Sequence, residues 1–209
     1  MAVMDFKKER RDLYQPSTAP AIVDVPEMLF LAADGQGDPN TDDTFQATLE
    51  ALYALAYAIR MHKAENGYHA YVVAPLEGFW DLSITPSASG FSLDKGSFRW
   101  TIALRQPDFV TPAVLERART VLAGKKPQCH TGHIRLERFC EGLCVQALHL
   151  GPYDAEPATL QSMKRYQEQR GFRLDYIGGR RHHELYLSRP NAAEPDKMKT
   201  ILRLPIKRR

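Results

Sequence analysis

The chain contains a degenerate internal repeat, in which two copies follow the same order of strand and helix signals. The first copy reads FLAADGQGDPN, then a long helical segment, PLEGFWDL and WTIALRQP. The second reads ALHLGPYDAEP, then a shorter helical segment, HHELYLS and KTILRLPIK. The order of these signals in each copy therefore predicts a strand, a glycine turn, a helix and then two further strands. Because neither unit can cover its own sheet face, we expect the two to pair about a pseudo-two-fold axis.

The repeat predicts an α+β fold of two pseudo-symmetric strand-helix-strand-strand modules, with an antiparallel sheet and a central ligand cleft. The expected boundaries are an N-terminal arm over residues 1–24 and a single domain over residues 25–209. Within that domain we expect module one at about 25–110, a connecting helix at about 111–124 and module two at about 130–209. A chain of 209 residues can bury the core that such a domain needs.

Turn residues and periodicity place the individual elements. Strands are expected at residues 26–33, 71–82, 98–105, 181–188 and 198–206. The first helix is expected to begin at Thr41 or Asp42 and to end near Gly67. Residues 133–150 are expected to form a hairpin that turns at Glu141-Gly142.

Two further segments are expected to be irregular. Serine, glycine and proline are frequent over residues 85–96, which predicts a loop. Residues 1–20 are polar and contain Pro16 and Pro20, so an irregular arm is expected, with Tyr14 as its anchor.

The charge and hydropathy patterns narrow the class of protein. The net charge is only +3, and the basic residues are scattered apart from Lys7–Arg11, Arg180–Arg181 and Lys207–Arg209. We therefore expect no nucleic-acid surface, which would need a sustained basic face. Charged residues interrupt every apolar stretch, and the N-terminus lacks the apolar segment of a signal peptide, so no membrane partner and a cytoplasmic location are expected. Three cysteines make no disulfide framework.

The strand HHELYLS carries the most informative candidate residue, Glu184. Strand alternation puts His182, Glu184 and Tyr186 on one face and leaves the other to His183 and the leucines. A carboxylate in an aromatic groove can neutralise a cationic ligand, or can act as a base with a raised pKa. The alternative is an ordinary surface glutamate on a half-buried strand.

Aromatic residues of the first copy are the other candidates. A cage of aromatic rings binds flat molecules by stacking and cations through the ring faces. The candidate ligand-binding residues are Trp80, Trp100, Tyr53, Tyr57, Tyr186, Phe79 and Glu77. Plain core packing is the alternative for the tryptophans, and a structural carboxylate is the alternative for Glu77, the repeat counterpart of Glu184.

No metal site and no cofactor are expected. Cys129, His130, His133, Cys140 and Cys144 fit no standard zinc finger. The sequence also lacks a nucleophile elbow, a P-loop and a dinucleotide fingerprint.

Several motifs together resemble the GyrI-like small-molecule-binding family, from Val25-Pro26 to Pro205. They are Gly35-x-Gly37-x-Pro39, Leu52-Tyr53-x-Leu55-x-Tyr57, Pro75-Leu76-Glu77-Gly78-x-Trp80, Arg105-Gln106-Pro107-Asp108-Phe109-Val110 and Gly151-x-Tyr153-x-x-Glu156-Pro157. The resemblance implies two strand-helix-strand-strand modules around a cleft, with a buried glutamate that corresponds to Glu184 and meets cationic ligands. Family members include effector domains of multidrug-sensing regulators. The roughly 25 residues before strand one are too short for a helix-turn-helix, so a stand-alone member is expected.

The P-L-E-G-x-W and R-Q-P-D-F-V stretches resemble a stand-alone branch, the cyclopropanoid cyclopropyl hydrolases. This resemblance implies detoxification of DNA-alkylating natural products related to yatakemycin. Water would open the strained cyclopropane, Glu184 would orient or deprotonate that water, and a tyrosine would donate toward the carbonyl oxygen.

Two other functions remain open at this point. One is a non-catalytic protein that sequesters multiple cationic or aromatic drugs. The other is a gyrase-type protein-interaction module, as some GyrI-like proteins are linked to gyrase. An aromatic groove could also serve as a homodimer surface.

Overall fold

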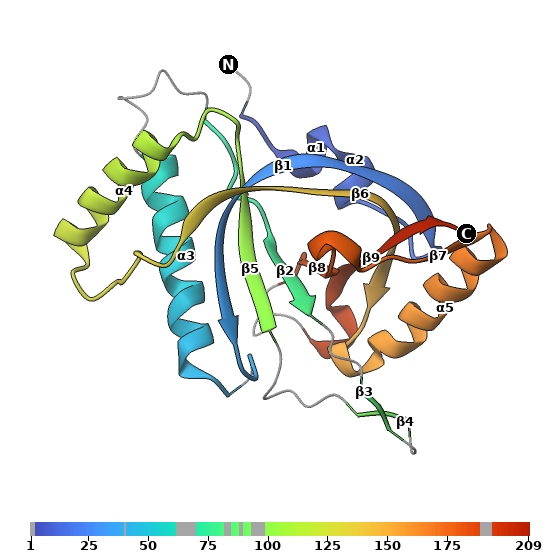
Figure 1. Ribbon diagram of the computed structural model, residues 1–209. Helices are drawn as coiled ribbons and strands as arrows, with labels where there is room; N and C mark the ends of the chain where they lie inside the picture. The colour runs from blue at the N-terminus through green and yellow to red at the C-terminus, as the bar shows by residue number, and fades with distance from the viewer. Residues whose placement is uncertain are drawn as a thin grey trace. The chain divides into compact units, whose positions relative to one another are not determined.

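The computed structural model describes residues 3–39, 41–61, 70–81, 85–87, 90–92, 99–188 and 194–209. These residues divide into two units. Figure 1 labels their helices and strands. The first unit comprises Met1–Asp5, Met28–Ala74 and Gly78–Arg138, and the second comprises Phe6–Glu27, Pro75–Glu77 and Phe139–Arg209. Strands β1 (Ala21–Gln36), β2 (Leu76–Asp81) and β6 (Arg135–Leu150) contribute residues to both.

The first unit follows the order predicted for module one. Helix α3 (Asp43–Met61) comes after β1, and β2, β5 (Arg99–Gln106) and α4 (Pro112–Lys125) follow. Strand β1 pairs antiparallel with β5, from Leu29 opposite Gln106 to Gln36 opposite Arg99. The Asp42 carboxylate accepts a hydrogen bond from the Thr44 backbone N–H at 2.7 Å, so Asp42 caps α3 as predicted. The predicted helix end near Gly67 lies outside the described residues.

The second unit is organised around its last strand. Its elements are α1 (Phe6–Glu9), α2 (Arg11–Tyr14), η2 (Tyr153–Ala155), α5 (Glu156–Gln169), β7 (Phe172–Leu174), η3 (Ile177–Gly179), β8 (His182–Tyr186), η4 (Pro195–Lys197) and β9 (Lys199–Arg208). Strand β9 pairs antiparallel with β6, β7 and β8. An apolar cluster joins α5 to these strands, with Val145, Ala147, Met163, Phe172, Leu202, Leu204 and Ile206 at its centre. Burial of this apolar cluster stabilises the unit.

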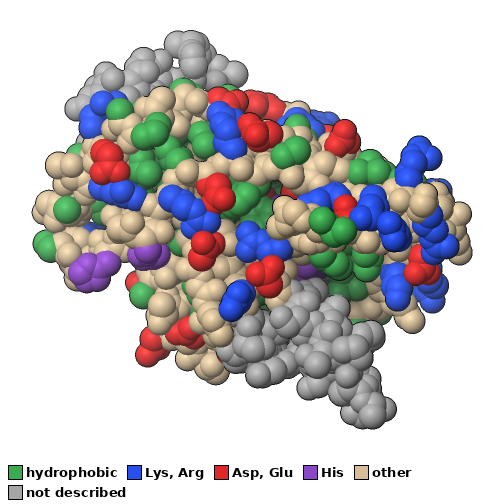
Figure 2. Space-filling model, in the orientation of Figure 1, with side chains coloured by type: hydrophobic (Ala, Val, Ile, Leu, Met, Phe, Trp, Pro, Cys, Tyr) green, Lys and Arg blue, Asp and Glu red, His purple; other side chains and the backbone are tan. Residues whose placement is uncertain are grey.

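The predicted α+β class is confirmed. Among the described residues, seven strands belong to one antiparallel sheet, and β3 (Thr85–Ser87) and β4 (Gly90–Ser92) form a separate pair. A strand followed by a helix and then by further strands appears twice along the chain, first as β1, α3 and β2–β5 and then as β6, α5 and β7–β9, so each copy has more strands after its helix than the two predicted. None of the described helices has the length and apolar character needed to span a membrane. Acidic and basic side chains are interspersed over the left and centre of the face drawn in Figure 2, and Lys and Arg side chains gather at its right-hand end.

The predicted hairpin at Glu141-Gly142 is wrong. Strand β6 runs without interruption from Arg135 to Leu150. Gly142 has a φ of +61°, a left-handed conformation that glycine adopts without steric cost. The glycine therefore accommodates an irregular point inside a long strand instead of ending it.

Three other segments differ from their predictions. The predicted loop at 85–96 contains the antiparallel pair of β3 and β4. The strand predicted from Tyr71 begins only at Leu76, since Tyr71 forms an isolated parallel bridge with Met4. The N-terminal arm is helical at α1 and α2, and the first strand starts earlier, at Ala21. Tyr14 is buried with 1% exposure, so its predicted anchoring role is confirmed.

Trp100 is the largest side chain among those most completely buried in the described part of the chain. Its ring lies against Gly35 on the paired strand, where an added Cβ would be 2.1 Å from the ring carbons. Phe45 of α3 packs edge-on against the indole, with the ring centroids 4.9 Å apart. Only a residue without a side chain can occupy position 35 beside this ring.

We expect Gly35→Ala to destabilise the protein by about 1–3 kcal/mol, because the new methyl group must displace Trp100 from a packed core. Urea unfolding of the two proteins measures the difference in free energy. Gly124→Ala is the control, since an added Cβ there meets nothing within 4 Å on helix α4. It should cost nothing and can gain up to about 1 kcal/mol. Equal stability of Gly35→Ala and wild type would contradict this account.

Candidate functional site

Strand β8 presents His182, Glu184 and Tyr186 on one face, as its alternation predicts. The His182 Nε2 atom lies 2.8 Å from Glu184 Oε1. The Tyr186 hydroxyl donates to Glu184 Oε2 at 2.6 Å. His182 Nδ1 lies 3.2 Å from the Arg203 carbonyl oxygen, so both ring nitrogens face acceptors. Each oxygen of Glu184 is thereby held by one neighbour on the same strand.

These contacts keep Glu184 charged. Burial alone would raise the pKa of Glu184, but the hydrogen bonds from His182 and Tyr186 outweigh it and lower the pKa below its usual value. The Glu184 side chain is still 14% exposed. The raised pKa suggested by the sequence is therefore wrong for this residue.

The start of α5 adds a tyrosine and a second carboxyl group to this site. The ring of Tyr153 packs edge-on against Tyr186, with centroids 5.9 Å apart and planes at 82°. Glu156, three residues later, is 7% exposed. Its Oε1 atom is buried and has no hydrogen-bond partner among the described residues. Burial, together with the charges of Glu184 and Asp154, raises the pKa of Glu156 to about 9.

The two tyrosines are held in their neutral form. Burial and the nearby carboxylates Glu184 and Glu156 raise the pKa of Tyr153 to about 12. Burial and Glu184 raise the pKa of Tyr186 well above its ordinary value. The site therefore joins an ionised carboxylate, a carboxyl group that keeps its proton at neutral pH, and two neutral hydroxyls. We call these four residues, Tyr153, Glu156, Glu184 and Tyr186, the acidic tyrosine site.

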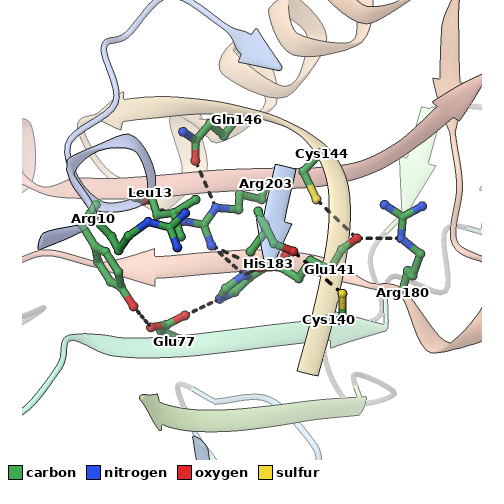
Figure 3. Close-up of polar contacts among 12 residues, drawn as sticks. Arg10, Leu13, Glu77, Cys140, Glu141, Cys144, Gln146, Arg180, His183 and Arg203 are labelled. Carbon is green, nitrogen blue, oxygen red and sulfur yellow. Dashed lines mark hydrogen bonds and ion pairs between the residues drawn. The ribbon is translucent and has the colours of Figure 1, made fainter. Parts of the chain in front are cut away.

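His183, on the opposite face of β8, belongs to a buried ion network with Glu77, Glu141 and Arg203 (Figure 3). Tyr14 joins this network through its hydrogen bond to Glu77. His183 lies between two carboxylates, with Nε2 3.0 Å from Glu77 Oε2 and Nδ1 2.9 Å from Glu141 Oε1. Tyr14 donates to the other oxygen of Glu77 at 2.9 Å. These contacts favour the structural alternative for Glu77.

Arg203 supplies the second positive charge of the network. Its Nη1 atom lies 3.1 Å from Glu141 Oε1, and Nε donates to Gln146 Oε1 at 3.1 Å. Nη2 donates to the Leu13 carbonyl oxygen at 2.6 Å, which ties α2 to the sheet. With His183 protonated, two positive and two negative groups balance, which is what burial of charges requires.

The aromatic candidates of the first unit lie in two settings. Tyr53 and Tyr57 stack with centroids 6.5 Å apart and line a groove between α3 and α4, together with Val121 and Lys125. Tyr57 is 46% exposed there. By contrast, Phe79, Trp80 and Trp100 are buried, and Phe79 packs edge-on against Phe30. The indole N–H of Trp100 has no hydrogen-bond partner among the described residues.

Sequence reasoning missed Glu156 and Tyr153 as site residues. Both belong to the motif Gly151-x-Tyr153-x-x-Glu156-Pro157, which carried the family resemblance. A glutamate before proline at a helix start is typical of an ordinary first turn, so nothing local marks its burial. Within the described residues, no group of three or more His, Cys, Asp or Glu side chains has an arrangement that could hold a metal ion.

The chain is an α+β protein whose candidate site groups two carboxyl groups and two tyrosines. The sequence profile of the GyrI-like small molecule binding domain matches residues 18–207, so the chain belongs to the GyrI-like family. No curated protein sequence matches the chain.

Solved structures agree with this membership. A hydrolase from Listeria innocua is similar, with 45% identity over 98% of this chain and 100% of that one and a TM-score of 0.88. An uncharacterized conserved protein from Listeria innocua has 45% identity over the same shares and a TM-score of 0.90. The C-terminal domain of EcmrR has 13% identity over 91% of this chain and 98% of that one, with a TM-score of 0.54, which shows a shared fold alone.

The buried ion network predicts a pH dependence of stability. Burial lowers the pKa of His183, but Glu141 and Glu77 outweigh it, so the folded pKa is raised above the reference value of 6.5. Its stabilising contribution is complete below pH 6.5 and is lost as pH rises through the folded pKa. Burial opposes ionisation of Glu141, yet His183 and Arg203 lower its pKa to about 2, so its contribution is complete above 4.5 and fades toward pH 2.

We expect His183→Gln to lower the free energy of unfolding by about 3 kcal/mol or more near pH 6, because it removes the positive charge that lies between two buried carboxylates. The difference from wild type should shrink as pH rises. Urea unfolding over a pH series measures both effects. His133→Gln, at an exposed position, is the control. A difference that stays constant through the alkaline range would contradict the charged state of His183.

Proposed function

We propose that the protein binds bulky aromatic or cationic small molecules and hydrolyses cyclopropanoid DNA-alkylating compounds, with Glu184 as the catalytic carboxylate. The observation that carries the proposal is the state of Glu184, which is ionised, partly exposed and fixed at both oxygens. The similarity to a Listeria innocua protein described as a hydrolase is in keeping with an enzymatic role.

The surroundings of Glu184 suit a flat or cationic ligand. Tyr153 and Tyr186 are only partly buried, and their rings meet edge to face beside the carboxylate. Aromatic faces attract both planar rings and cations, and a fixed negative charge favours the cations further. A neutral electrophile that is flat and conjugated can stack on the same tyrosine rings.

Hydrolysis of a cyclopropane conjugated to a carbonyl needs few groups. A water molecule attacks the ring carbon, a C–O bond forms and a strained C–C bond breaks. The released electron pair moves through the conjugated system to the carbonyl oxygen, which takes up a proton. Glu184 accepts the proton that the water loses, and its fixed position orients the water for attack. Since ring strain already favours opening, orientation supplies much of what the reaction needs.

The roles proposed for the aromatic residues of the first unit are separate from this step. Trp80, Trp100 and Phe79 are assigned to stacking, and Tyr53 and Tyr57 to ligand contact. These assignments stay predictions. Tests of them must allow for the packing of Trp100 against Gly35 and Phe45, since removal of the indole also disturbs the core.

We expect Glu184→Gln to reduce hydrolysis by about 10²- to 10⁴-fold, because the amide cannot accept the proton of the attacking water. To measure hydrolysis, the protein is incubated with a spirocyclopropyl dienone alkylator, and the mass of the small molecule is followed over time. Hydrolysis increases this mass by that of one water molecule. Glu194→Gln is the matched control, since the Glu194 side chain is 73% exposed and pairs only with Lys197 among the described residues.

The two variants separate three outcomes. Turnover in wild type and Glu194→Gln that is lost in Glu184→Gln supports the proposal. Full turnover in Glu184→Gln removes the site assignment. Unchanged compound that elutes with wild-type protein contradicts hydrolysis and favours sequestration.

A further inference from the structure

Glu156 is a second buried carboxyl group beside Glu184, and the reaction outlined above gives it no role. We propose that Glu156 is the proton donor of this reaction and that it works as the acid opposite Glu184. The inference rests on the proposed function and assigns the proton that the carbonyl oxygen takes up.

Glu156 lies where α5 begins, and the turn before it packs on β8. It is the first residue of α5, directly after the η2 turn that carries Tyr153. The contact of Tyr153 with Tyr186 fixes this turn against β8. Glu156 is 93% buried as a residue, and its Oε1 atom has no protein partner among the described residues. A buried carboxyl oxygen without a partner is costly, and such groups persist where they serve a function.

Its surroundings keep the proton on this carboxyl group. The negative charges that face Glu156 are Glu184 of β8 and Asp154 of its own turn. Tyr153 and Tyr186 are neutral, and His149 of β6 is engaged by Thr159 and the Pro152 carbonyl. The helix N-terminus favours a charged carboxylate. Burial and the charges of the two carboxylates outweigh the effect of the helix N-terminus, so the pKa of Glu156 is raised to about 9.

This arrangement divides acid and base between two carboxyl groups. As water adds to the cyclopropane carbon, its proton passes to Glu184. The electron pair of the broken C–C bond reaches the carbonyl oxygen, which takes the proton from Glu156. The product is the substrate plus one water, and the two carboxyl groups recover their first states by exchanging one proton. Tyr153 and Tyr186 are weaker acids, because their pKa values lie above that of Glu156.

The test compares wild type, Glu156→Gln and Glu168→Gln over a pH range with the same spirocyclopropyl dienone. Glu168 is an exposed residue of the same helix and serves as the matched control. Wild type and Glu168→Gln should lose kcat/KM as pH rises through about 9, where Glu156 ionises. Glu156→Gln should lose about 10²- to 10⁴-fold in kcat and should lose this alkaline limb.

A measurement without substrate separates the inference from the proposed function. The urea midpoint of wild type should fall relative to Glu156→Gln between pH 4.5 and about 9, because the unfolded Glu156 releases its proton first. Hydrolysis by wild type with an unchanged alkaline limb in Glu156→Gln overturns the donor role alone. Parallel urea midpoints would also overturn it. Absence of hydrolysis in wild type overturns the proposed function, and the donor role with it.

Discussion

The ion pair between His183 and the carboxylates of Glu77 and Glu141 is the interaction on which the second unit depends. His183 is fully buried, and its partner across the ladder is Arg203, so both positive groups of the network stand side by side in the sheet. Strand side chains alternate between faces, and a slip of one residue would move His183 out of the network and Glu184 into it. The network therefore fixes the register of β8. By fixing the register, it also fixes which face presents Glu184.

The acidic tyrosine site depends on a different balance. Glu184 keeps its charge because His182 and Tyr186 compensate for its burial. Glu156 is buried near the same negative charge, and its Oε1 atom has no hydrogen-bond partner among the described residues. Two carboxyl groups in one apolar setting do not both ionise readily, so their proton affinities separate. The raised pKa of Glu156 lowers the stability of the folded protein at neutral pH. Destabilising arrangements of this kind occur mainly at sites where the chemistry needs an acid and a base together.

Local patterns predicted much of the fold and part of the site. Helical spacing and the Asp42 cap located α3, and Thr111 caps α4 with a hydrogen bond from Val114 N at 3.4 Å. Alternation in HHELYLS placed Glu184 with its two strand neighbours. These features depend on residues within a few positions of one another, where backbone geometry alone decides which side chains meet. The predicted hairpin failed because a glycine at positive φ can end a strand, but Gly142 is accommodated inside the continuous strand β6.

The residues that local patterns missed share one property: their partners lie far away in the sequence. Glu141 meets His183 and Arg203, which are more than 40 residues further along the chain. Its place in β6 is therefore decided by charges that the surrounding residues do not reveal. Glu156 also depends on residues that are distant in the sequence. The packing of α5 on the sheet buries Glu156 and brings it near Glu184. From the local sequence, a glutamate at a helix start is expected to be exposed and ionised. The tertiary fold buries Glu156 near the carboxylate of Glu184, which raises its pKa and makes it a candidate acid.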